Sequence, residues 1–186
     1  MNTAVKIALA GEGGQGVQSV AAILVEAAYD SGKEALYIPN FGVEQRGGVS
    51  IAYCQISEKK IGSPKFDYAD LVIALSKRAV ERTKRYINGD TMFIYDTSIE
   101  GIEDKLPQNA KKVLGIPALE IAKNELHPRV FNVIIMGAAI EATRVVAMEQ
   151  AKKALENKLG YKFEQAPNLR DLNYKALEKG SKLVKG

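Results

Sequence analysis

Apolar residues near the start of the chain form two short runs separated by a helical repeat. Residues 3–10 (TAVKIALA) are a bounded apolar run, which predicts a buried first strand. Apolar residues then recur at helical spacing and predict a helix over residues 15–30, while residues 34–38 (EALYI) predict a second strand. The helical repeat consists of Val17, Val20, Ala21, Leu24 and Ala28. This order favours a parallel sheet with a right-handed crossover.

The same pattern continues to the end of the chain. Further strands are predicted at residues 49–56, 70–75, 91–95 and 112–114. Further helices are predicted at residues 77–87, 118–125, 131–146, 147–158 and 171–184. The helix at 131–146 is apolar on most faces, which indicates burial in the core or in a subunit interface. Together these elements predict a single α/β domain over residues 1–186, with a Rossmann-like, mostly parallel sheet flanked by helices and a helical C-terminal tail.

The composition is that of an ordinary globular protein. Hydrophobic residues make up 46% of the chain and charged residues 26%, which excludes wholesale disorder. The formal net charge is +4, which suits anionic ligands or an acidic partner and does not by itself indicate nucleic acid. The apolar stretch 133–140 is too short to span a bilayer, and no signal peptide is recognisable, so we expect a cytoplasmic protein.

The chain has one cysteine and one histidine. Cys54 alone cannot form an internal disulfide or hold an iron–sulfur cluster, and His127 leaves no histidine cluster for a metal. Any redox metal must therefore sit on another chain. We expect Cys54 to be a small core residue in its strand and His127 to cap a helix end or face solvent.

The turn GEGGQG at residues 11–16 is the first motif with a chemical meaning. Its glycines match G-x-G-x-x-G directly after a strand and at the start of a helix, where free amides attract phosphate. A dinucleotide site usually has an acidic residue at the end of the second strand, where this chain has Pro39 and Asn40. The motif also lacks the Lys-Ser/Thr of a Walker A loop. The turn therefore either binds a phosphate or anionic cofactor, in preference to NAD, or is a tight strand–helix turn without a ligand.

A second block, FGVEQRGG at residues 41–48, makes the interpretation of the glycine-rich turn more specific. With GEGGQGV, the chain resembles the gamma subunits of the 2-oxoacid:ferredoxin (acceptor) oxidoreductases, which act on pyruvate, 2-oxoglutarate, branched-chain 2-oxoacids and indolepyruvate. The family blocks are G-x-G-G-Q-G-V and Tyr-Gly-x-x-x-Arg-Gly-Gly, so Phe41 stands where a tyrosine is usual and lacks its hydroxyl. Further matches are Ser63–Pro64, Ala69–Asp70 and Asn132.

The resemblance implies one subunit of an oxidoreductase complex that is not active alone. The alternatives are a purely structural subunit without a ligand of its own and an independent nucleotide-binding protein, against which the missing acidic residue after the second strand counts. Such complexes decarboxylate a 2-oxoacid on thiamine diphosphate, pass electrons through iron–sulfur clusters to ferredoxin and transfer the acyl group to coenzyme A. Thiamine diphosphate, magnesium and the clusters are then expected on companion alpha and beta subunits, with a delta subunit left open. Coenzyme A is the one cofactor expected here, as a hypothesis, and a homodimer of the isolated chain is plausible if an apolar face is exposed.

The resemblance implies no catalytic residue and no metal ligand on this chain. The candidate cofactor-binding residues are Gly11, Gly13, Gly14, Gln15, Gly16, Arg46, Gly47 and Gly48. The glycine-rich turn would either give amides to a phosphate of coenzyme A or line the interface with the thiamine-binding subunit. Arg46 would either grip a carboxylate or phosphate or be solvated. The basic run at residues 77–85 is expected to be a solvated face, with docking of an acidic partner such as ferredoxin as the alternative.

Overall fold

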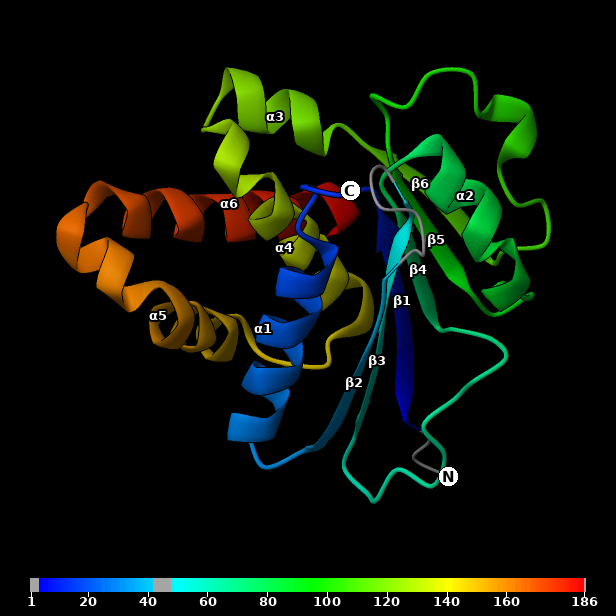
Figure 1. Cartoon of the computed structure of the whole chain (residues 1–186), viewed down its shortest axis with the longest axis horizontal. Helices are drawn as coiled ribbons and strands as arrows, with labels where there is room; N and C mark the ends of the chain where they lie inside the picture. The colour runs from blue at the N-terminus through cyan, green and yellow to red at the C-terminus, as the bar shows by residue number, and fades with distance from the viewer. Residues whose placement is uncertain (1–3, 42–47, 186) are drawn as a thin grey trace.

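The apolar runs of the chain become the strands of a central sheet, in a computed structural model that describes residues 4–41 and 48–185 (Figure 1). The described strands are β1 (Val5–Gly11), β2 (Glu34–Asn40), β3 (Ser50–Ser57), β4 (Leu71–Ala74), β5 (Met92–Asp96) and β6 (Lys112–Ile116). Their order across the sheet is β2-β3-β1-β4-β5-β6. The mostly parallel sheet predicted from the sequence is confirmed, because β1, β4, β5 and β6 pair in parallel.

A crossover through α1 joins β1 to β2, as predicted, but the two strands are not neighbours in the sheet. β1 and β2 run in the same direction, but β3 lies between them and pairs antiparallel to both. The physical reason is the short connection between β2 and β3, which is long enough to reverse the chain and too short for a parallel crossover. As a consequence, the end of β2, the start of β3 and the end of β1 meet at one edge of the sheet.

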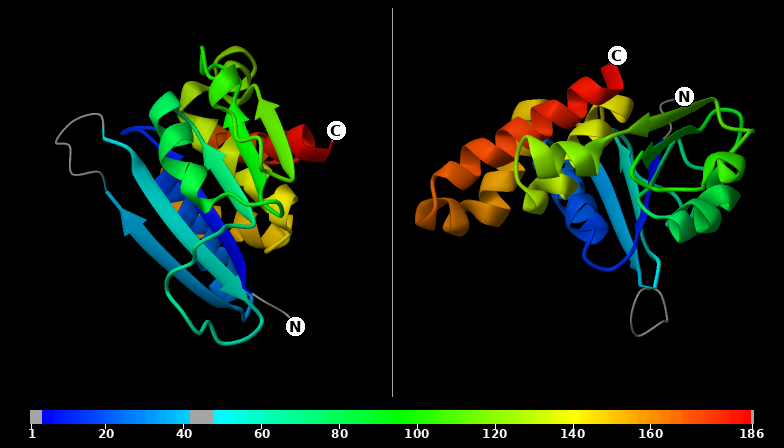
Figure 2. Two further views of the ribbon diagram at one scale, coloured as in Figure 1. Left: turned by 90° about the vertical axis from the view of Figure 1, so that its right-hand side faces the viewer. Right: turned by 90° about the horizontal axis from the view of Figure 1, so that it is seen from above.

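Helices cover both faces of the sheet (Figures 1 and 2). One face carries α1 (Val17–Asp30), α3 (Ala118–Asn124), α4 (Phe131–Thr143), α5 (Met148–Gln165) and α6 (Asn168–Lys185). The other carries α2 (Lys77–Thr83) and the 3-10 turn η1 (Lys84–Tyr86), which together occupy the predicted helix 77–87. Strand residues alternate between the two cores: Ile7 and Leu9 pack under α1, and Ala8 and Ala10 pack toward α2.

The predicted helical C-terminal tail is confirmed and packs along the rest of the domain. α4 ends earlier than predicted because Arg144 adopts a left-handed φ of 52°. α6 lies against α4 at a glycine crossing. A Cβ on Gly137 of α4 would overlap the carbonyl oxygen of Leu177, and a Cβ on Gly180 of α6 would overlap that of Ile134. The two helix backbones are therefore in direct contact.

Polar contacts add to this packing. The Ser181 hydroxyl donates to Glu141 Oε2 at 2.8 Å, and Lys185 lies 3.3 Å from the same oxygen. The hydrogen bond from Ser181, followed by that of Lys185, lowers the pKa of Glu141 from its ordinary value. The carboxylate form of Glu141 therefore helps to hold α6 on α4.

Candidate functional site

The glycine-rich turn lies at the point where two adjacent parallel strands lead to helices on opposite faces of the sheet. β1 and β4 are parallel neighbours with Ala10 opposite Ala74, and the chain leaves β1 for α1 on one face and β4 for α2 on the other. In open α/β sheets, ligands bind beyond the carboxyl ends of the strands at such a switch point. The fold therefore places residues 11–16 where a ligand is expected.

Gly13 and Gly14 are the exposed part of this turn. A Cβ on either would meet no heavy atom within 4 Å. Gly14 has φ of +90° and Gly16 of +75°, a left-handed conformation that disfavours other residues. Gly16 is also packed from behind, because a Cβ on it would lie 2.9 Å from the Cβ of Asn132 at the start of α4. The turn thus presents bare backbone outward while its inner side contacts α4.

Gln15 fixes the turn to the sheet. The backbone N–H of Glu12 donates to Gln15 Oε1 at 2.7 Å, and Gln15 Nε2 donates to the carbonyl of Leu75 at 2.7 Å. A Cβ on Gly11 would lie only 2.7 Å from the same Oε1, so glycine at position 11 lets the Gln15 side chain fold inward. The geometry gives Gln15 a positioning role, and direct contact between Gln15 and a ligand stays a prediction.

The start of α1 has the electrostatic character of an anion site. Gly16 is its N-cap and supplies no side-chain hydrogen bond, and its first turn contains no acidic residue. The first intrahelical bond of the turn runs from the Val20 N–H to the Gly16 carbonyl at 3.0 Å. The amides before it belong to the helix end where partial positive charge gathers, so a phosphate at Gly13 and Gly14 would be stabilised.

The second sequence block begins and ends at the same edge of the sheet. Gly11 pairs with Ser50, and Asn40 pairs with Ile51, so residues 41 and 48 lie at the same edge of the sheet as the glycine-rich turn. Gln18 of α1 bonds to both neighbouring strands: its Nε2 donates to Ser50 Oγ at 2.5 Å, and its Oε1 accepts from the Tyr37 hydroxyl at 2.5 Å. Gly48 is half-buried, whereas Arg46 and Gly47 lie outside the described residues.

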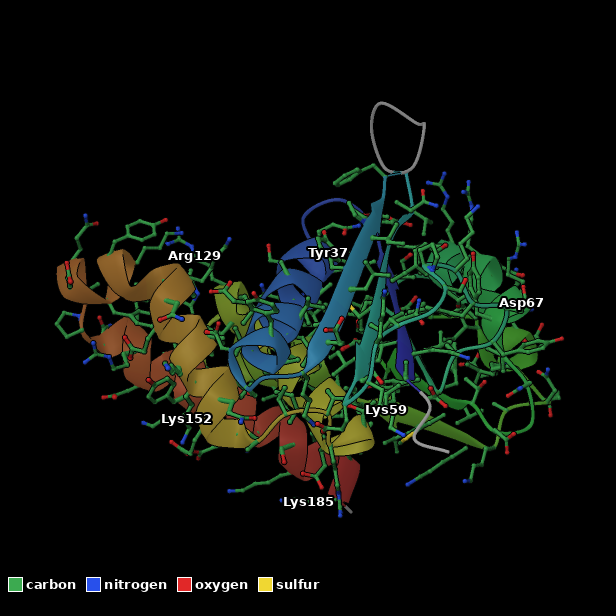
Figure 3. All side chains as sticks on the ribbon, turned by 90° about the horizontal axis from the view of Figure 1, so that it is seen from below. Tyr37, Lys59, Asp67, Arg129, Lys152 and Lys185 are labelled. Atoms are coloured by element: carbon green, nitrogen blue, oxygen red, sulfur yellow. The ribbon has the colours of Figure 1, made fainter. Side chains whose placement is uncertain are left out.

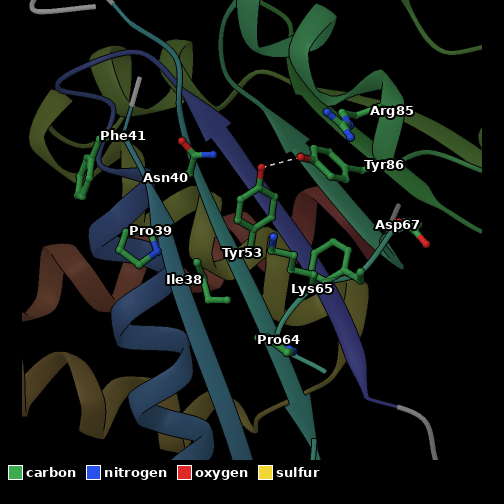
Figure 4. Close-up of a pocket in the computed structure, with 11 residues that line it drawn as sticks. Ile38, Pro39, Asn40, Phe41, Tyr53, Pro64, Lys65, Asp67, Arg85 and Tyr86 are labelled. Atoms are coloured by element: carbon green, nitrogen blue, oxygen red, sulfur yellow. Dashed lines mark hydrogen bonds between the residues drawn. The ribbon is translucent and has the colours of Figure 1, made fainter. Parts of the chain in front are cut away.

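An aromatic pocket of about 550 Å³ lies at this edge, on the α2 side of the sheet (Figure 4). Its lining includes Ile38, Asn40, Tyr53, Phe66, Arg85 and Tyr86. This pocket could not be predicted from the sequence, because its walls come from four separate segments: β2, β3, the segment before β4, and η1. The only available signal was Tyr53, which the alternation of the third strand places on the face opposite Cys54.

The remaining candidate residues have structural explanations. Cys54 is fully buried in the core, and this burial raises the pKa of its thiol to about 12, as expected of an unreactive core residue. His127 Nδ1 accepts from the Arg129 N–H at 3.1 Å and so caps the turn before α4. Residues 4–41 and 48–185 contain no cluster of three metal-ligating side chains and no helix long and apolar enough to cross a membrane.

Comparisons with known proteins confirm the resemblance seen in the sequence. Residues 6–183 match the family described as "Pyruvate ferredoxin/flavodoxin oxidoreductase". The chain is 34% identical over 153 residues to the 2-oxoglutarate synthase subunit KorC of Methanocaldococcus jannaschii, with 81% of each chain covered. It is 30% identical over 177 residues to the ketoisovalerate oxidoreductase subunit VorA of Methanothermobacter marburgensis, covering 95% of this chain and 36% of VorA. The chain thus spans about a third of that relative's length.

Two solved structures share the fold. The keto/oxoacid ferredoxin oxidoreductase gamma subunit of Geobacter sulfurreducens superposes with a TM-score of 0.79 at 27% identity, with 97% of this chain and 98% of that chain covered. The 2-oxoglutarate:ferredoxin oxidoreductase of Magnetococcus marinus, solved with 2-oxoglutarate, coenzyme A and succinyl-CoA bound, superposes with a TM-score of 0.88 at 27% identity. That match covers all of this chain and 32% of the other.

Proposed function

Because the chain belongs to the pyruvate ferredoxin/flavodoxin oxidoreductase family, we propose that it is the gamma-type subunit of a 2-oxoacid:ferredoxin oxidoreductase. The complex would convert a 2-oxoacid to acyl-CoA and CO2 and pass the electrons to ferredoxin. Support comes from the family match and from the gamma subunit with which the chain shares the fold over 97% of its length. The coverage of only 36% of VorA and 32% of the Magnetococcus chain fits a unit that acts as one part of a larger enzyme.

Within this complex, the glycine-rich turn binds a phosphate group of coenzyme A. The observation that carries this proposal is the bare backbone of Gly13 and Gly14 beside the uncapped start of α1. Coenzyme A supplies the thiol that accepts the acyl group. The chain's own residues hold and orient it: backbone amides bind the phosphate, Gln15 fixes the turn against Leu75, and Asn132 supports the turn from behind.

Thiamine diphosphate, magnesium and the iron–sulfur clusters are assigned to companion alpha and beta subunits, with a delta subunit left open. The residues of this chain do not fit a cluster, because its single cysteine is buried and its thiol pKa is raised. The sulfur and nitrogen ligands that such a group needs must come from elsewhere in the complex.

A purely structural role for the turn is the second candidate. It is favoured by Phe41, whose side chain is 68% exposed at the same edge, since exposed apolar rings often mark a protein contact. In that case the turn would pack against a partner subunit and bind no ligand.

Substitution of Gly13 separates the two candidates. Gly13 has open space around it and no left-handed φ, whereas Gly14 would be strained by any side chain. We expect Gly13→Asp to raise the Kd for coenzyme A about tenfold or more, because a carboxylate displaces the phosphate from charge-assisted hydrogen bonds. Gly13→Ala serves as the steric control, and Gly62→Asp, at another open and exposed glycine, as the charge control. An unchanged affinity in Gly13→Asp would favour the structural role.

A further inference from the structure

Gln18 joins three elements that lie far apart in the sequence. It is in the first turn of α1, two residues after the end of the glycine-rich turn. Its Oε1 accepts from the Tyr37 hydroxyl of β2 at 2.5 Å, and its Nε2 donates to Ser50 Oγ of β3 at 2.5 Å. The Ser50 hydroxyl makes a longer contact, 3.5 Å, with the carbonyl oxygen of Asn40 at the end of β2. One side chain therefore ties α1 to both β2 and β3.

The direction of each hydrogen bond in this chain of groups is fixed. The Asn40 carbonyl can only accept, so the Ser50 hydroxyl donates its single proton there and accepts from Gln18. The Gln18 amide then turns its nitrogen toward Ser50 and its oxygen toward Tyr37, which has to be the donor. Both partners are therefore specific, because loss of either hydroxyl leaves one end of the Gln18 amide without its bond.

These groups lie on the α1 side of the sheet. Gln18, Tyr37 and Ser50 are all half-buried. Figure 3 shows Tyr37 beside α1, and its ring packs against the core that this helix covers. Burial, followed by the neighbouring Cys54, raises the pKa of Tyr37 from its ordinary value. The hydroxyl therefore stays protonated at neutral pH and remains a donor to Gln18.

The bonds of Gln18 act at both ends of the second sequence block, residues 41–48. Asn40 directly precedes this block, and Ser50 follows it by two positions. Ser50 also pairs with Gly11, so the start of β3 adjoins the first residue of the glycine-rich turn. β2 is an edge strand of the described sheet, and β3 pairs with it from one side only. The bond from Tyr37 to Gln18 adds a second attachment for β2, from the helix.

We propose that Gln18 is a positioning residue for coenzyme A binding, which fixes the ends of β2 and β3 relative to the glycine-rich turn. This inference rests on the proposed function. Both ends of the Gln18 amide are occupied by protein groups, whereas the ligand would meet the bare backbone of Gly13 and Gly14. A ligand at this edge binds tightly only while the strand ends and the turn keep their arrangement. Its apparent affinity falls in proportion to the fraction of molecules that keep it.

Isothermal titration of coenzyme A into the full chain tests this role. We expect Gln18→Ala to raise the Kd about five- to tenfold, because it removes both bonds. Tyr37→Phe and Ser50→Ala each remove one hydroxyl and should raise the Kd about two- to fivefold. Ser50→Thr keeps the hydroxyl on a residue that suits a strand, and it should retain the wild-type Kd. Equal Kd values for Ser50→Ala and Ser50→Thr would contradict the role of this hydroxyl.

A double variant and a remote control separate positioning from a general loss of stability. In Gln18→Ala/Tyr37→Phe, the second change should add nothing to the Kd, because Gln18→Ala has already removed the bond. Tyr174→Phe also removes one hydroxyl bond, 2.7 Å long, to Glu156. Its ring contacts Lys152, which lies far from Tyr37 (Figure 3), so this variant should leave the Kd unchanged. Additive effects in the double variant, or an equal effect of Tyr174→Phe, would overturn the positioning role.

Steady-state kinetics of the assembled complex gives a second readout. Because Gln18 positions the binding edge, Gln18→Ala should raise the KM for coenzyme A about five- to tenfold and change kcat by less than about twofold. A lowered kcat with an unchanged KM would overturn the inference. The same measurement decides the question if coenzyme A binds the isolated chain too weakly for titration.

The outcomes separate this inference from the proposed function. If Gly13→Asp weakens coenzyme A binding and the Gln18, Tyr37 and Ser50 variants do not, the positioning role is wrong and the function stands. If those variants weaken binding while Gly13→Asp has no effect, the positioning role stands and the assignment of phosphate to the turn fails. If neither group of variants changes the Kd or the KM, both proposals fail.

Discussion

The glycine crossing of α4 and α6 makes a sharp prediction about stability. In a helix, alanine normally replaces glycine with a gain of up to about 1 kcal/mol, because glycine loses more backbone entropy on folding. At Gly137 and Gly180, the new methyl group would instead overlap a carbonyl oxygen of the facing helix. That obstacle is main chain and cannot rotate away, so α6 must move off α4.

The size of the effect follows from the two opposing terms. Forcing a methyl group into a close-packed contact costs about 1–3 kcal/mol, and the rigid obstacle places this case at the upper end. With the helix-propensity gain subtracted, Gly137→Ala or Gly180→Ala should lower the free energy of unfolding by about 2 kcal/mol. For a chain of 186 residues this corresponds to a fall in Tm of about 4–8 °C.

Gly160→Ala is the matched control. Gly160 lies inside α5, and a Cβ there would meet nothing within 4 Å, so this variant should be more stable by up to about 1 kcal/mol. Urea unfolding followed by far-UV circular dichroism measures all three variants; the chain has no tryptophan to follow by fluorescence. A Gly137→Ala protein as stable as wild type, or a Gly160→Ala protein destabilised equally, would refute the account of the crossing.

Three further predictions test other parts of the structure. Cys54 is buried with its pKa raised to about 12, so a thiol reagent should not label the native protein and should label it after unfolding in urea; rapid native labelling would contradict this burial. Glu141 has a lowered pKa in the folded state, so its contribution to stability is present above its ordinary value near 4.5 and is lost as the pH falls through the lower folded value. Urea midpoints across that range should fall less steeply for Glu141→Gln than for wild type, and parallel curves would argue against the effect. Gln15→Ala removes two hydrogen bonds from the turn and should cost about 1–3 kcal/mol in urea unfolding, whereas the exposed Gln108→Ala should change stability by less than about 0.5 kcal/mol.

Much of the fold could be predicted from the sequence, because the spacing of apolar residues along the chain agrees with the burial of those residues in the structure. The runs at residues 3–10 and 70–75 and the repeat in residues 15–30 each contain enough apolar residues to identify a strand or helix. The place of β3 could not be predicted. Its alternation indicates a half-buried strand but carries no information on which neighbours it pairs with, and it is the short connection after β2 that returns it antiparallel.

The candidate site, too, could be predicted from the sequence only in part. The glycines at 13, 14 and 16 could be predicted as a phosphate turn, because local backbone chemistry depends on adjacent residues. The inward fold of Gln15 onto Leu75 joins residues 60 positions apart, and the pocket joins Tyr53 to Tyr86, 33 positions apart. Contacts at such separations depend on the order of strands in the sheet, which the hydrophobic pattern of one sequence does not specify.

The central claim is that this chain acts as one subunit of a 2-oxoacid oxidoreductase complex. Native purification of the tagged chain from its own cells, with identification of the co-purifying chains and a visible absorbance spectrum, tests it most directly. The account predicts a brown complex that contains thiamine-binding and cysteine-rich partner chains and forms acyl-CoA from a 2-oxoacid. A colourless protein that purifies alone, without such partners or activity, would contradict it.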